Sequence, residues 1–157
     1  MIVVADTTPL HYLVLIEEIH LLPALYGRVL IPPAVAAELT ARGTPEPVRR
    51  WIGSQPRWLE VLAPKRLPSD LPEFLGPGER DAIALGLERD CDALLMDDWE
   101  GREEARRRQL HVAGTLRILA SAAEKGLTDL PAAISRLRAT NFRASEKLLQ
   151  SFLKNAD

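Results

Sequence analysis

The sequence is poor in cysteine and in aromatic residues: Cys91 is the only cysteine among 157 residues, and aromatic residues make up 5%. A single cysteine excludes an intramolecular disulfide and a zinc site built from several cysteines, and it favours a reducing compartment. Because aromatic residues are scarce, Leu, Ala, Val and Ile must fill the core, which favours helices packed on a sheet over a β-sandwich.

Long apolar runs are also missing. No stretch approaches the ~18 consecutive apolar residues of a membrane span. The first residues, Met-Ile-Val-Val-Ala-Asp, lack the basic and long apolar regions of a signal peptide. We therefore expect a cytoplasmic protein that does not associate with membranes.

The net charge of −2 gives no overall sign of a nucleic-acid-binding protein. Local charge differs from this average, because Arg102, Arg106, Arg107 and Arg108 lie close together in the chain. Such a run is equally consistent with a solvated helix face and with phosphate binding.

Apolar runs and turn residues predict an alternation of strands and helices. Strands are expected at residues 2–5, 29–31, 58–62, 93–96 and 110–112. Helices are expected after Thr8-Pro9, after Pro32-Pro33, and at residues 46–54, 79–89 and 101–108. The alternation predicts a three-layer α/β sandwich with a mainly parallel sheet. We expect one domain over residues 1–157, with a helical C-terminal extension from about residue 126.

Acidic residues follow two of the expected strands directly. Asp6 follows the first strand, and Asp97 and Asp98 follow the strand at 93–96. Because parallel strands end at the same edge of a sheet, where ligand sites gather, these side chains are expected to lie close together.

Two further acids stand out by their surroundings. Glu38 interrupts the otherwise apolar stretch from Pro32 to Leu39, where a carboxylate is costly unless it is paired or bound to a metal. Glu79 follows Gly76-Pro77-Gly78 at the start of a helix, where free N–H groups and the helix dipole stabilise a carboxylate.

Each acid has an ordinary interpretation when it is taken alone. Asp6 could cap a helix, Glu79 could be a favourable first-turn charge, Glu38 could face solvent, and Asp97-Asp98 could form a turn. Together they predict a metal site, because clustered carboxylates raise one another's pKa unless a cation intervenes. Hard oxygen ligands suit Mg²⁺ or Mn²⁺, and such an ion can activate water toward a phosphodiester.

Four segments resemble the motifs of PIN domains, in particular the VapC-like toxins. They are Val3-Val4-Ala5-Asp6-Thr7-Thr8-Pro9-Leu10, the stretch from Ile31 to Leu39, the stretch from Gly76 to Leu85, and the stretch from Leu94 to Arg102 followed by residues 111–116. They occur in family order from residue 2 to about residue 120, and the C-terminal extension is covered poorly.

The resemblance implies a PIN fold, a Mg²⁺ or Mn²⁺ site and cleavage of single-stranded RNA by a ribonuclease of the hydrolase class. Asp6, Glu38, Glu79 and Asp97 match the metal-site acids, and Asp98 competes with Asp97 for the fourth place. Thr7 matches a hydroxyl residue that often supports the first acid. Membership of a toxin–antitoxin pair would add an antitoxin partner and a homodimer, for which Leu10, Leu13 and Val14 are a candidate apolar surface.

Two alternatives stay open at this stage. The same fold could be a catalytically inactive module that binds RNA or protein. A phosphatase with an aspartyl nucleophile is less consistent with the sequence, because position 8 is Thr instead of a second Asp, and a receiver domain would need a late lysine after a strand, which is absent. A dinucleotide-binding domain would need Gly-x-Gly-x-x-Gly after a strand, which is also absent.

Overall fold

Five short parallel strands form one sheet in a computed structural model that describes residues 1–154. The strand order is β3-β2-β1-β4-β5, so the N-terminal strand is central. The strands are β1 (Val3–Ala5), β2 (Val29–Ile31), β3 (Leu59–Val61), β4 (Ala93–Leu95) and β5 (Val112–Ala113). The predicted parallel α/β sheet is thereby confirmed.

The apolar runs form strands because both faces of the sheet are covered. Val3 and Ala5 pack into one core and Val4 packs into the other, and all three side chains are fully buried. A strand buried on both faces needs apolar residues at every position, which explains the uninterrupted run that the sequence shows.

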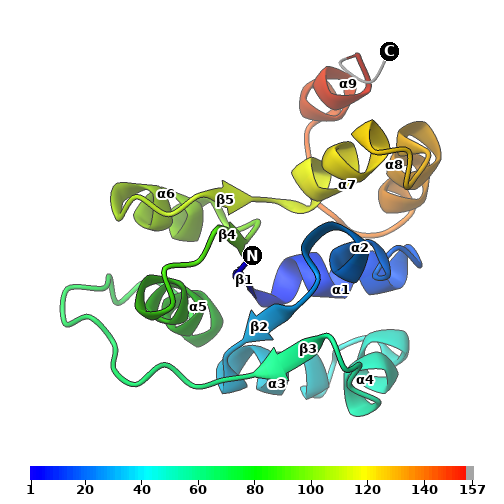
Figure 1. Ribbon diagram of the computed structural model, residues 1–157. Coiled ribbons are helices and arrows are strands. Elements are labelled where there is room, and N and C mark those ends of the chain that lie inside the picture. The colour runs from blue at the N-terminus through cyan, green and yellow to red at the C-terminus, as the bar shows by residue number, and fades with distance from the viewer. Residues whose placement is uncertain (155–157) are drawn as a thin grey trace.

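Helices cover both faces of this sheet. On one side lie α5 (Pro77–Glu88) and α6 (Trp99–Arg107), and on the other lie α1 (Thr7–Leu15), α2 (Leu21–Tyr26), α7 (Thr115–Glu124) and α8 (Leu130–Arg138) (Figure 1). The core on the α1 side also takes in Val35 and Leu39 of α3 (Pro33–Thr40) and Val48 of α4 (Glu46–Gly53). None of the helices within residues 1–154 is long and apolar enough to cross a membrane.

The expected helical extension is present as α8 and α9 (Glu146–Lys154), and residues 155–157 lie outside the described part of the chain. The aromatic ring of Phe142, between these helices, packs edge-on against Tyr12 with ring centroids 5.0 Å apart. The Tyr12 hydroxyl also donates a hydrogen bond of 2.7 Å to Asn141. The extension is therefore joined to α1 near the start of the chain.

Several element boundaries differ from the prediction by one or two residues, and three of them bear on the site. Asp6 holds the N-cap position of α1 and the helix begins at Thr7, so Thr8 is already helical. Helix α5 begins at Pro77, because proline is favoured in the first helical turn, so Glu79 is the third helical residue and still lies in the first turn. The last strand contains Val112 and Ala113 instead of residues 110–112, because its pairing with Leu94 and Leu95 of β4 sets its position.

Candidate active site

The ends of β1 and β4 bring acidic residues to one edge of the sheet. Ala5 is in register with Leu95, and the Asp6 backbone N–H donates a 2.8 Å hydrogen bond to the Leu95 carbonyl. Asp6 therefore lies beside the turn that carries Asp97 and Asp98, as the parallel strands predicted.

Asp6 is buried, with only 2% of its surface exposed. It occupies the N-cap position of α1, yet its side chain makes no capping hydrogen bond, and its Oδ1 atom is buried without a hydrogen-bond partner. Burial raises the pKa of Asp6 well above its usual range, and the nearby charges of Glu79, Glu38 and Asp98 raise it further, while the Thr7 backbone opposes them. Helix capping therefore does not explain this carboxylate.

Glu38 reaches this region from α3. Its carboxylate accepts a hydrogen bond from the hydroxyl of Thr7, so the predicted supporting threonine orients the second acid instead of the first. A Cβ atom added to Gly78 would lie 2.7 and 2.8 Å from the two carboxylate oxygens of Glu38. Glycine at position 78 is what allows α5 to approach Glu38 this closely.

Glu79 lies in the first turn of α5 and is half-buried. Burial raises its pKa, and the charges of Asp98 and Glu38 add to that effect, while the helix backbone opposes it. A raised carboxyl pKa is what a group needs in order to exchange protons near neutral pH.

Asp97 and Asp98 point to different partners. Asp97 turns toward α7, where the Thr115 backbone N–H and hydroxyl donate hydrogen bonds of 2.9 and 2.6 Å to its two oxygens. Its pKa is raised by burial and lowered by Thr115 and by Arg102.

Asp98 caps α6, accepting a 2.8 Å hydrogen bond from Gly101, and its charge acts on both Asp6 and Glu79. Of these two neighbours, the exposed Asp98 is the one whose charge raises the pKa of Asp6 and Glu79.

No lysine, arginine or histidine within residues 1–154 forms an ion pair with Asp6, Glu38, Glu79 or Asp98. The unpaired Oδ1 of Asp6 and the mutual repulsion of these carboxylates fit a hard divalent cation. In the part of the chain that the structure describes, however, no three Asp, Glu, His or Cys side chains are already arranged to hold a metal ion. Coordination by the full set would therefore require side-chain rotation.

Two residues near the site were missed by sequence reasoning. Thr115 fixes Asp97, and its place after Gly114 at a helix start could have suggested such a role. Asp81 on α5 has a pKa raised by burial and by Glu38, with Arg80 opposing. Asp81 and Glu79 are two residues apart and therefore lie on different faces of α5, so the helical pattern did not indicate that Asp81 belongs near the site.

Comparisons with known proteins identify the family and the fold. The DUF3368 family model, which is described as a PIN domain, matches residues 2–157. No curated protein matches the chain. Among solved structures, a PilT N-terminus domain protein from the hyperthermophilic archaeon Sulfolobus solfataricus P2 is similar at a TM-score of 0.58 and 18% identity, over 78% of this chain and 93% of that one. At this identity the structural match supports the fold alone.

Proposed function

This chain belongs to the PIN-domain family, a fold that generally carries nuclease activity, and on that premise we propose that it is a Mg²⁺- or Mn²⁺-dependent endoribonuclease that hydrolyses single-stranded RNA. The observation that carries the proposal is Asp6: a buried carboxylate with an unpaired oxygen beside three other acids and without a cationic side chain. The repulsion in such a cluster is relieved either by protonation at raised pKa values or by a bound cation, and a divalent cation relieves it while the acids stay ionised.

The metal ion, when bound, would supply the positive charge that activates water and stabilises the leaving oxygen of a phosphodiester. Asp6, Glu38 and Asp98 are the residues that would hold it, because Asp98 and not Asp97 is coupled to Asp6. The Thr7 hydroxyl would keep the Glu38 carboxylate turned toward the site. Glu79, whose pKa is raised, would orient a water molecule and accept its proton.

Asp97 has a different part in this proposal. Its two oxygens are occupied by Thr115, and Arg102 partly offsets its charge. We therefore assign it to positioning the β4–α6 turn, so that Asp98 faces Asp6. The sequence-based choice of Asp97 as the fourth acid remains an alternative, and the metal-binding prediction in the Discussion separates the two.

The direct test is cleavage of a 5′-labelled single-stranded RNA in Mn²⁺ and in EDTA. We expect cleavage that requires the metal and that Asp6→Asn abolishes. Asp90→Asn is a matched control, because Asp90 is exposed and its positive φ of 50° is one that asparagine also adopts. RNA cleavage that is equal in EDTA and Mn²⁺, or that survives in Asp6→Asn, would contradict the proposal.

The toxin role and an antitoxin partner rest on the resemblance to VapC-like toxins. An arginine of such a partner could pair with Asp6 or Glu79 and compete with the metal. If so, saturating Mn²⁺ should weaken the partner's binding, and Asp6→Asn should remove that effect. Co-purification followed by mass spectrometry of the genomic neighbour's product is the experiment that identifies the partner.

The apolar surface first considered for the partner or for a homodimer needs correction. Leu10 and Leu13 of α1 are fully buried in the core, and Val14 is partly buried and packs against the same core, so the three residues do not form an open apolar surface. A homodimer, if it forms, must use other residues, and the molar mass in solution measured by light scattering is the test.

One observation favours the alternative of a catalytically inactive binding module: the acids within residues 1–154 are not preassembled around a metal position. A protein of that kind would bind RNA without cleaving it in any divalent metal. The cleavage assay described above, run beside a binding assay, distinguishes the two functions.

A further inference from the structure

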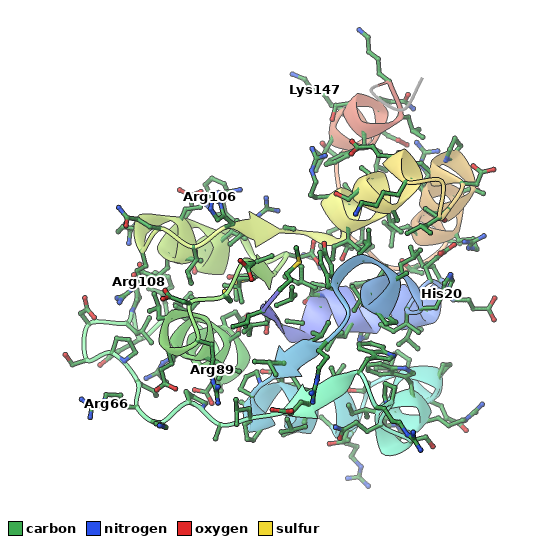
Figure 2. All side chains as sticks on the ribbon, viewed as in Figure 1. His20, Arg66, Arg89, Arg106, Arg108 and Lys147 are labelled. Carbon is green, nitrogen blue, oxygen red and sulfur yellow. The ribbon has the colours of Figure 1, made fainter. Side chains whose placement is uncertain are left out.

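A groove of about 390 Å³ lies between the sheet edge and the C-terminal extension. Its wall includes Asp97 and Gly114 at the carboxyl ends of β4 and β5, and Phe142, Leu148 and Phe152 of the extension. The groove therefore adjoins the acidic edge of the sheet and depends on the helical tail for one of its sides. In Figure 2, Arg106 projects from α6 toward the upper side of the view, on which α9 also lies.

Four arginines line this groove, against the single carboxylate of Asp97: Arg102, Arg106, Arg117 and Arg143. Arg106 pairs with Glu103 at 3.0 Å, but Arg102, Arg117 and Arg143 form no ion pair among residues 1–154. The lining therefore has an excess of positive charge that the described part of the chain does not neutralise.

Arg102 lies at the inner part of this charged wall. Its Nε atom is buried and has no hydrogen-bond partner, so one donor is left unsatisfied. Burial lowers the pKa of Arg102, and the nearby charge of Arg106 lowers it further. An anion in the groove would accept hydrogen bonds from the guanidinium groups that line it and relieve the repulsion between Arg102 and Arg106.

Aromatic rings accompany the arginines. The Arg117 guanidinium lies 5.2 Å from the centroid of the Phe152 ring, and Phe142 lines the same groove. Guanidinium planes and aromatic faces are the surfaces on which unpaired nucleic-acid bases stack. An acidic peptide would use the charges but not these faces, so the combination favours a single-stranded nucleic acid.

We propose that this groove, lined by Arg102, Arg106, Arg117 and Arg143, binds the RNA strand beside the cleavage site. The arginines contact the backbone phosphates, and Phe142 and Phe152 provide a face for a base. The inference rests on the proposed function, because it assigns the groove to the same substrate, and it gives the C-terminal extension a role in holding that substrate. The contacts are to phosphate and to ring faces, so binding is expected to depend little on base sequence.

Equilibrium binding of a 5′-fluorescein single-stranded RNA tests the inference. Fluorescence anisotropy is measured in EDTA, so that no cleavage occurs, for the parent, Arg117→Gln and Arg143→Gln. Both arginines are exposed, so their replacement should not disturb the core. Arg50→Gln is the matched control, because Arg50 is an exposed arginine on α4 that pairs with Glu46.

Each groove variant should bind RNA about tenfold more weakly, the size expected when one charge-assisted hydrogen bond is removed. The slope of log affinity against log salt should become shallower by about 0.7 for each phosphate that the variant no longer binds. The Arg50→Gln control should keep the parent's affinity and slope, and melting temperatures should be alike in all four proteins.

Parent-like affinity and salt slope in both groove variants would overturn the inference, and cleavage by those proteins would leave the proposed function intact. RNA binding that depends on the groove without any cleavage would support the inference and refute the ribonuclease. Absence of RNA binding by the parent would overturn the inference. So would a result in which the variants lose binding of a hepta-glutamate peptide but keep RNA, because the groove would then serve an acidic protein.

Discussion

Replacing Thr115 by valine tests whether Asp97 is anchored to the start of α7. The Thr115 side chain is fully buried, and its hydroxyl donates a 2.6 Å hydrogen bond to Asp97. Valine has nearly the same shape, so Thr115→Val removes the donor without opening a cavity. The 2.9 Å hydrogen bond from the residue 115 backbone N–H to Asp97 should remain.

The structure sets the expected size of the effect. A hydrogen bond to a charged group contributes about 1.5–3 kcal/mol. Asp97 is half-buried, so water can partly replace the missing donor, and we expect the lower part of this range, about 1.5–2 kcal/mol. For a domain of this size, that loss corresponds to a melting temperature lowered by roughly 3–8 °C.

The loss should depend on pH in a definite direction. Burial raises the pKa of Asp97 and Thr115 opposes that rise, so the valine variant should have a still higher Asp97 pKa in the folded state. The Thr115 hydroxyl stabilises the ionised carboxylate of Asp97 more strongly than it stabilises the protonated carboxyl group. The stability difference between parent and variant should therefore be complete above the folded-state pKa of Asp97 and should shrink as the pH falls through it.

Urea unfolding of the two proteins over a pH series measures this difference. Thr115→Ser is the control, because it keeps the hydroxyl and loses one buried methyl group, which costs about 1 kcal/mol at every pH. A double-mutant cycle with Asp97→Asn isolates the pair. A loss below about 0.5 kcal/mol in Thr115→Val, an equal loss at acid and neutral pH, or additivity with Asp97→Asn would refute the reasoning.

Three further predictions concern the acids. In EDTA, the free energy of unfolding should fall as the pH rises from the usual aspartate pKa of about 3.9 through the raised folded-state pKa of Asp6. Asp6→Asn should flatten this pH dependence. If denaturant titrations give the same pH slope for the variant and the parent, Asp6 is not the source of the dependence. Calorimetric titration should show weaker Mn²⁺ binding in Asp6→Asn and in Asp98→Asn than in the parent. Parent-like binding in Asp98→Asn together with loss of binding in Asp97→Asn would make Asp97 the fourth metal-site acid. Parent-like binding in all three variants would rule out the metal site. Glu38→Gln should abolish RNA cleavage. Because it removes one of the mutually repelling carboxylates, it should leave the metal-free protein as stable as the parent or more stable by up to ~1 kcal/mol. A large loss of stability without metal would instead mark Glu38 as a structural group.

Local residue patterns were sufficient for the architecture. The run from Val3 to Ala5 is a strand with no exposed position, and the alternation of strands with helices led to a parallel sheet. Chain order then brought Asp6 and the pair Asp97-Asp98 to one edge, because parallel strands all end on the same side. These features follow from backbone periodicity and from the handedness of strand–helix–strand connections, both of which a single sequence carries.

The direction of individual side chains was decided only by tertiary packing. The sequence could not separate Asp97 from Asp98, because neighbouring residues after a strand turn opposite ways and the helices that meet them set which way each faces. In the folded chain Thr115 of α7 holds Asp97, and the cap of α6 leaves Asp98 coupled to Asp6.

The same holds for the arginine-lined groove. Arg102, Arg117 and Arg143 are far apart in the chain and come from different elements, so no local pattern connects them. Their meeting depends on how the C-terminal extension packs beside α7 and against Tyr12 of α1. Packing between distant segments depends on the complementary shapes of the whole core, and that information is not contained in the spacing of any one stretch of sequence.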